Sequence, residues 1–103
     1  MTKRLPIHFT TKAKKDLKKI RKKNKDLYAK IEKIINELSE NPYHGSIKTG
    51  DLKNIYSIDI YNTGINYELA YRIEINEDGD AVIILLFGTR ENFYTELKRY
   101  LDS

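Results

Sequence analysis

The stretch Ala81-Val82-Ile83-Ile84-Leu85-Leu86-Phe87-Gly88-Thr89-Arg90-Glu91-Asn92-Phe93-Tyr94 decides how the rest of the chain is interpreted. It begins with seven consecutive apolar residues, bounded by Asp78-Gly79-Asp80 on one side and by Gly88 on the other. An uninterrupted apolar run of this length is typical of a strand that is buried on both faces. We therefore predict that residues 81–87 form the central strand of a sheet.

The polar residues that follow this strand are the first candidates for a functional site, because the core behind a buried strand holds its end rigidly. Arg90 carries a planar, permanently charged guanidinium that matches a phosphate through two hydrogen bonds. The alternative for Arg90 is a surface ion pair with Glu91 or another acid of the helix end, worth only ~0–1 kcal/mol. Tyr94 can stack on a base or take part in proton transfer, or it can help to anchor the last helix.

Composition places the chain among ordinary globular domains. Its 103 residues are enough for one domain with a modest core, which we take to span residues 1–103. The absence of cysteine excludes disulfides and thiolate sites, and the two histidines, His8 and His44, are too few for a histidine metal cluster. We expect no metal and no cofactor. The sequence has neither an apolar run of membrane-spanning length nor a signal-peptide core near Met1, so we expect a cytoplasmic protein without membrane contact.

Positive charge is concentrated between residues 12 and 33. This block holds eleven basic and three acidic residues, a net +8, whereas the whole chain is +4 and its remainder therefore −4. Such a block is the footprint of a protein that binds a polyanion such as nucleic acid, or it is a solvated helical surface that keeps the protein soluble. The candidates for RNA contacts in this block are Lys15, Lys18, Lys19 and Lys22.

The remaining patterns predict an α+β domain with the element order β-α-α-β-β-β-α. Helical spacing of apolar residues predicts two helices, and strict alternation predicts half-buried strands. The Asn41-Pro42 pair ends the second helix, since the residue before a proline avoids the helical region. We expect an N-terminal strand and a helical hairpin packed on a mainly antiparallel four-stranded sheet, with a short C-terminal helix. The expected elements are a strand at 7–10, helices at 12–22 and 25–39, a loop at 43–54, strands at 56–61, 67–75 and 81–87, and a helix after Gly88.

The helical hairpin should cover one face of this sheet and leave the other exposed. Pleat parity assigns to the exposed face, beside Arg90, the residues Ser57, Asp59, Tyr61, Glu68, Ala70 and Arg72. Asp59 and Glu68 can provide a general base, or they pair with Arg72 or Lys53. Tyr61 is a candidate for base stacking or for a cross-strand pair. Arg72 can reach a phosphate or neutralise Glu68.

The loop that enters the sheet adds further candidates. Lys48 and Lys53 are placed to contact the RNA backbone, which positions RNA without reading its sequence. His44 is a candidate acid–base group, although histidines in loops are usually just exposed. The spacing of the acidic residues indicates no metal site.

The full-length order of these motifs resembles the RelE/ParE superfamily of bacterial and archaeal toxins from toxin–antitoxin modules. The likeness covers nearly the whole chain, and no single motif is a sharp signature. Its marks are Phe9-Thr10-Thr11-Lys12-Ala13-Lys14-Lys15-Asp16-Leu17, Asn41-Pro42, Gly50-Asp51-Leu52, Tyr67-Glu68-Leu69-Ala70-Tyr71 and Phe87-Gly88-Thr89-Arg90-Glu91-Asn92-Phe93-Tyr94.

The resemblance implies a toxin silenced by a cognate antitoxin. In the RelE branch it implies a metal-independent, ribosome-dependent endoribonuclease that cleaves translated mRNA and inhibits translation, with Arg90 and Tyr94 at the cut. Its partners would then be the antitoxin, the ribosome and mRNA. This sequence departs from that branch at Glu68, where an arginine is usual, and at Asp59, where lysine is common. We keep Glu68 as a third catalytic candidate.

The same resemblance leaves a second function open. A ParE-like member would inhibit DNA gyrase, and a catalytically degenerate toxin would act by protein binding alone. The acidic residues Asp59 and Glu68 favour this alternative, whereas the basic block and Arg90 favour the nuclease.

Overall fold

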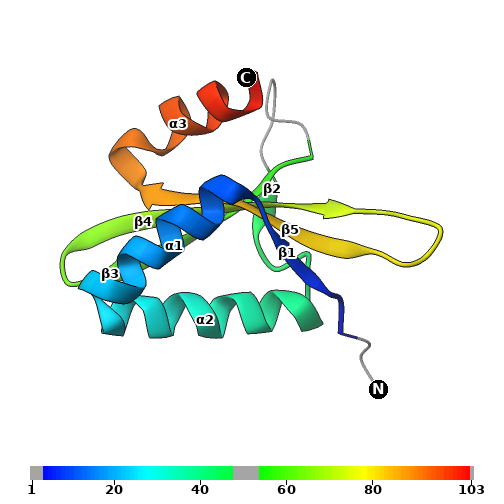
Figure 1. Cartoon of the computed structure of the whole chain (residues 1–103), viewed down its shortest axis with the longest axis horizontal. Coiled ribbons are helices and arrows are strands. Elements are labelled where there is room, and N and C mark those ends of the chain that lie inside the picture. Colours follow the sequence, from blue (N-terminus) through cyan, green and yellow to red (C-terminus); the bar gives the residue numbers. More distant parts are fainter. Residues whose placement is uncertain (1–3, 48–53, 103) are drawn as a thin grey trace.

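The computed structural model describes residues 4–47 and 54–102. Three helices and five strands follow one another in this part of the chain (Figure 1). In order they are β1 (Ile7–Phe9), α1 (Thr11–Lys23), α2 (Lys25–Glu40), β2 (Ser46–Ile47), β3 (Tyr56–Asn62), β4 (Ile65–Glu74), β5 (Ala81–Thr89) and α3 (Arg90–Asp102).

The predicted α+β class is confirmed, and the predicted number of strands is wrong by one. In the described part of the chain the strands form one sheet in the order β1-β5-β4-β3-β2, with β1 parallel to β5 and all other neighbours antiparallel. The additional strand is β2, within the predicted loop 43–54, where Ser46 pairs with Ser57 and Ile47 with Tyr56. Two residues are too few to produce an alternating pattern. Because β2 extends the sheet, the middle strand is β4, and β5 lies between β4 and β1.

Capping side chains set the limits of the helical hairpin. The Thr10 hydroxyl accepts a hydrogen bond from the Ala13 N–H and begins α1. Asn24 donates its N–H to the Ile20 carbonyl and accepts from the Leu27 N–H through its side chain. One residue therefore ends α1 and begins α2, which keeps the two amphipathic helices side by side.

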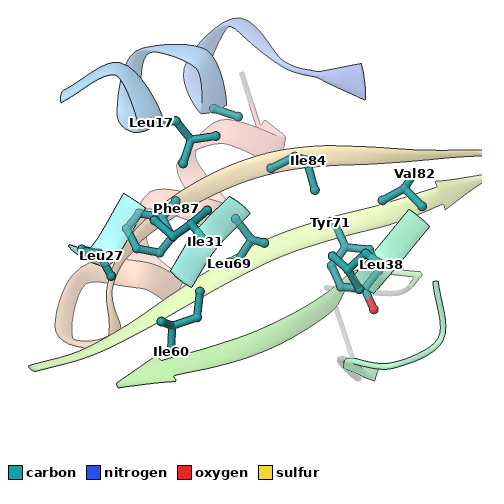
Figure 2. Close-up of a cluster of buried hydrophobic side chains, with 11 residues drawn as sticks. Leu17, Leu27, Ile31, Leu38, Ile60, Leu69, Tyr71, Val82, Ile84 and Phe87 are labelled. Atoms are coloured by element: carbon teal, nitrogen blue, oxygen red, sulfur yellow. The ribbon is translucent and has the colours of Figure 1, made fainter. Parts of the chain in front are cut away.

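The sheet is covered on both faces. On one face Leu17, Leu27, Ile31 and Leu38 of the hairpin pack against the sheet (Figure 2). On the other face Phe93 and Leu97 of α3 pack against the sheet, and Figure 1 shows α3 and α2 on opposite sides of it. The sheet residues of the first core are Ile60, Leu69, Tyr71, Val82, Ile84 and Phe87, and those of the second are Ala70, Leu85 and Leu86.

The covering by α3 corrects the prediction of an open second face. Ser57, Glu68 and Ala70 point to that face as pleat parity requires, but all three are buried. Ala70 has no side chain beyond Cβ, so Phe93 and Leu97 can approach the sheet closely. Asp59, Tyr61 and Arg72 remain exposed as predicted.

A β-bulge lets β5 serve both cores. Ala70 pairs with Leu86 and Tyr71 with Ile84, so that Leu85 is an extra residue on β5. Both Leu85 and Leu86 consequently belong to the α3 core, and Phe87 returns to the hairpin side. The bulge explains why two consecutive residues of this strand, Leu85 and Leu86, face the same core.

The start of α1 satisfies the backbone of β5 where β1 ends. The Thr10 N–H donates to the Ile84 carbonyl at 3.1 Å, and the Thr10 hydroxyl donates to the Leu85 carbonyl at 2.6 Å. The Phe87 N–H donates to an Asp16 carboxylate oxygen at 3.2 Å. Buried backbone groups need such partners. Thr10 and Asp16 therefore supply the hydrogen bonds that β5 would lack where β1 ends. Among the described helices, none has the length and apolar character needed to cross a membrane.

We predict that Thr10→Ala lowers the free energy of unfolding by about 1–3 kcal/mol, because it removes a helix cap and the hydrogen bond to the Leu85 carbonyl. Thr11→Ala is the matched control, since Thr11 is exposed and the change should stay within about 0.5 kcal/mol. Urea denaturation of both variants measures the difference. Equal losses would contradict the role assigned to Thr10.

Candidate functional site

A polar cleft of about 250 Å³ lies on the second face of the sheet, beside the beginning of α3. The sheet register explains how it forms. Asp59 of β3 is opposite Glu68 of β4, and Glu68 is opposite Gly88 of β5, two residues before Arg90. The polar side chains that line the cleft are His44, Ser46, Ser57, Asp59, Glu68, Arg90 and Tyr94.

An ion pair between Arg90 and Glu68 is the main electrostatic feature of this cleft. Arg90 Nε lies 3.7 Å from Glu68 Oε1, and the side chains are 60% and 2% exposed respectively. Arg90 is the first residue of α3, where the positive end of the helix dipole disfavours a cation. The buried carboxylate of Glu68 offsets this, so the pair holds a charged guanidinium at the mouth of the cleft.

The sequence left open a pairing of Glu68 with Arg72 or Lys53, and of Arg90 with Glu91 or another acid of the helix end. The structure pairs Arg90 with Glu68, and Lys53 lies outside the described residues. In the structure Arg72 Nη2 lies 3.5 Å from Glu74 Oε2, and Arg72 lines a separate cleft with Tyr100. Glu68 and Arg72 lie on the same face, but α3 crosses that face over Ala70, the residue midway between them.

The two aromatic residues at the start of α3 have separate roles. Phe93 is completely buried and anchors the helix, whereas Tyr94 is 41% exposed and lines the cleft. Their rings meet edge to face with centroids 5.6 Å apart. Phe93 therefore fixes the direction of Tyr94 without itself reaching the site.

Gly88 leaves space on the sheet beneath α3. A Cβ atom at Gly88 would lie 3.3 Å from Glu96 Oε2, so a larger residue would press against the carboxylate of α3. Cross-strand neighbours on one face lie about 5 Å apart. The missing side chain opposite Glu68 thus helps α3 to approach the sheet.

The segment that carries His44 is tied to the sheet by Tyr71. The buried Tyr71 hydroxyl donates to the Pro42 carbonyl at 2.7 Å and accepts from the Gly45 N–H at 2.9 Å. Burial raises the pKa of Tyr71 above its ordinary value, although the Gly45 hydrogen bond acts in the opposite direction. A Cβ atom at Gly45 would lie 2.7 Å from the Tyr71 hydroxyl, so only glycine fits this contact.

The other predicted RNA-binding residues do not join the cleft. Tyr61 is 62% exposed on β3, and its carbonyl accepts a hydrogen bond from Lys30 Nζ. Lys48 and Lys53 lie outside the described residues. The basic candidates of α1 are exposed on the hairpin, which packs on the opposite face of the sheet from the cleft: Lys15, Lys18, Lys19 and Lys22.

The structure thus brings together Arg90, Tyr94 and Glu68 of the predicted site and adds Asp59 and His44, which the sequence also marked. Ser46 and Ser57 were not singled out as site residues. Pleat parity pointed to Ser57, whereas Ser46 in a two-residue strand carries no signal in the sequence. Within residues 4–47 and 54–102, no group of three or more His, Cys, Asp or Glu residues is arranged to hold a metal ion.

Comparison with known proteins gives a consistent family. The family model described as "ParE-like toxin of type II bacterial toxin-antitoxin system" matches residues 7–98. No curated protein sequence matches the chain significantly.

Three solved structures have a similar fold. A YoeB/ParE toxin from Agrobacterium tumefaciens has a TM-score of 0.68 and 14% identity, covering 84% of this chain and 99% of its own. The free E. coli toxin RelE, solved as a double arginine-to-alanine mutant, has a TM-score of 0.63 and 20% identity over 93% of this chain and 97% of its own. The same mutant in complex with an antitoxin RelB peptide has a TM-score of 0.62 and 20% identity, with coverages of 94% and 95%. At these identities the likeness concerns the fold.

We predict that Arg90→Ala lowers the free energy of unfolding by about 1–3 kcal/mol, because it removes the guanidinium that pairs with the buried Glu68 carboxylate. Adding Glu68→Gln should restore most of this loss, since the neutral amide has the same shape and no charge. The matched control is Arg72→Ala with Glu74→Gln, a partly exposed pair whose coupling should be about 0–1 kcal/mol. Thermal denaturation of the two double-mutant cycles measures the couplings. Similar couplings in both would show that burial of Glu68 has no electrostatic consequence.

We predict a distinct alkaline behaviour for Tyr71→Phe. The folded pKa of Tyr71 is raised above the ordinary 10.0, so its contribution to stability is complete below that pH and is lost as the pH rises through the folded pKa. The variant should lose about 1–3 kcal/mol at neutral pH, with its two hydrogen bonds, and decline less steeply above pH 10. Tyr61→Phe, an exposed tyrosine, is the control. Unfolding free energies from pH 7 to pH 11 test this, and an unchanged alkaline slope in Tyr71→Phe would refute it.

Proposed function

The chain belongs to the ParE-like toxins of type II bacterial toxin–antitoxin systems, and from this premise we propose that it is a ribosome-dependent endoribonuclease that cleaves translated messenger RNA. As a type II toxin it has a cognate antitoxin for a partner. The observation that carries the proposal is the cleft that gathers Arg90, Tyr94, Glu68, Asp59 and His44.

Cleavage of RNA without a metal requires charge stabilisation at the scissile phosphate and proton transfer at the 2′- and 5′-oxygens. Arg90 meets the first requirement. The atom nearest Glu68 is Nε, so the two terminal nitrogens remain available for the two phosphate oxygens. The ion pair keeps the guanidinium in one place before RNA arrives, which is the preorganisation that electrostatic catalysis needs.

The two carboxylates of the cleft have different environments and hence different proposed roles. Glu68 is buried and paired with Arg90, which favours a role in positioning the guanidinium. Asp59 is exposed on the neighbouring strand and is the better placed base for the 2′-hydroxyl. Tyr94 presents a partly exposed ring on which a base can stack.

The basic residues of α1 would serve a different part of the complex. Since Lys15, Lys18, Lys19 and Lys22 lie across the sheet from the cleft, they would contact ribosomal RNA and not the strand being cut. Such phosphate contacts add affinity without sequence preference and weaken as salt rises. Lys48 and Lys53, outside the described residues, remain candidates for contacts with the message.

One observation favours a second candidate function. Among the described residues that line the cleft, two carboxylates, Asp59 and Glu68, face a single arginine. An acidic cleft repels a phosphate backbone and suits a protein target better. The alternative is therefore an inhibitor of DNA gyrase, or a toxin without catalysis that acts by protein binding.

We predict that induced expression of the wild type produces new 5′ ends within the codons of an abundant translated message. Arg90→Ala should reduce these ends by about 10²-fold or more, the usual cost of losing one transition-state contact. Arg72→Ala, an arginine on the same sheet face outside the cleft, should leave them unchanged. The variant Arg90→Ala/Glu68→Gln should stay inactive although its stability is restored, which separates chemistry from folding.

A different set of results would contradict the nuclease proposal. Growth arrest without new 5′ ends, equal in the wild type and in Arg90→Ala, would overturn the nuclease proposal. Inhibition of gyrase supercoiling by the purified chain would then support the alternative.

A further inference from the structure

We propose that His44 is the general acid of this cleavage and gives its proton to the leaving 5′-oxygen. The inference rests on the proposed nuclease function and assigns the one proton transfer that Arg90 and Asp59 leave open. Two observations support it: His44 lines the cleft, and hydrogen bonds fix the backbone of residues 44 and 45.

His44 closes the side of the cleft opposite α3. The order β2-β3-β4-β5 across the sheet places the His44 segment next to Asp59, and Arg90 beyond Glu68. With strands about 4.8 Å apart, β2 and the end of β5 are roughly 14 Å apart. The long Arg90 side chain and the His44 imidazole therefore reach into the same small space from opposite sides. A cleft of about 250 Å³ has room for one phosphodiester link between them.

Among the described residue types that line this cleft, histidine is the proton donor best suited to neutral pH. Arginine does not release its proton, and an ionised carboxylate is an acceptor only. A tyrosine hydroxyl is a far weaker acid than imidazolium. The leaving oxygen of a ribose needs a proton as the P–O bond breaks, which is the task that imidazolium performs.

The backbone around His44 is held more firmly than an exposed loop residue requires. The His44 N–H donates to the Asn41 carbonyl at 3.2 Å, and the next N–H, that of Gly45, donates to the Tyr71 hydroxyl. At Gly45 a Cβ atom would lie only 2.8 Å from the Ser57 carbonyl, so this segment is pressed against β3. The imidazole is exposed to the cleft while its main chain is fixed to the sheet, the arrangement needed by a group that must meet a reacting atom.

The proposed step balances without a further reactant. The 2′-oxygen attacks phosphorus, and its proton passes to the Asp59 carboxylate. The bond from phosphorus to the 5′-oxygen breaks, and that oxygen takes the proton of His44. The products are a 2′,3′-cyclic phosphate and a 5′-hydroxyl end, with Asp59 protonated and His44 neutral.

The test uses ribosomes programmed with a message whose A-site codon carries either an ordinary 5′-oxygen link or a 5′-bridging sulfur. A thiolate leaves without a proton, so the sulfur link does not need an acid. His44→Gln should cleave the oxygen link about 10²–10³-fold more slowly than the wild type does, and the sulfur link within a few-fold of the wild type. The matched control is His8→Gln, an exposed histidine of β1 at the other edge of the sheet, which should cleave both links normally.

The outcomes separate the inference from the proposed function. If the wild type cleaves neither link, the nuclease proposal itself fails. If the wild type cleaves both and His44→Gln is unaffected, or is slowed equally on both links, His44 is not the acid. A loss confined to the oxygen link supports the assignment, because a structural defect would slow both reactions alike.

Discussion

The rest of the structure depends on β5 being buried on both faces. A strand of this kind needs a helical layer on each side, and the chain provides them in different ways. The hairpin α1–α2 comes from the start of the sequence and is joined to β5 through Thr10 and Asp16. The second layer is α3, which follows β5 directly and must fold back over the sheet. The bulge at Leu85 provides apolar residues for both layers from one continuous run.

The candidate site is a consequence of this second layer. When α3 covers Ala70 and Leu86, it also brings its first turn over Glu68, a residue that the strand pattern alone would leave in water. A buried carboxylate requires a cation, and Arg90 at the start of the same helix supplies it. The attraction between Arg90 and Glu68 offsets both the cost of burying the carboxylate and the unfavourable position of the arginine at a helix N-terminus. The ion pair at the cleft therefore stabilises two placements, each of which would be unfavourable alone.

The family likeness gives information about the fold, and the residues of the cleft give information about the function. The fold is shared with YoeB/ParE and RelE toxins, and a shared fold does not by itself imply a shared function. The function must consequently be argued from the side chains that line the cleft. The acidic residues Asp59 and Glu68 both line the cleft. Asp59 is exposed, whereas Glu68 is buried and paired with Arg90. The two carboxylates can therefore have different roles.

By itself the sequence determined the elements whose signal is local. Helical spacing predicted α1 and α2 to within one residue at each end, because their apolar stripes repeat every turn. The position of Arg90 and Tyr94 just past the apolar run identified two members of the cleft. Only the tertiary structure decided the remainder. The strand β2 is too short to produce a period, and the cover of α3 over Glu68 depends on packing between segments far apart in the chain. Pleat parity assigns a residue to a face, but whether water or a helix covers that face is decided by packing. For the same reason no local pattern could reveal that the Tyr71 hydroxyl, within the opposite core, holds the segment that places His44 at the cleft.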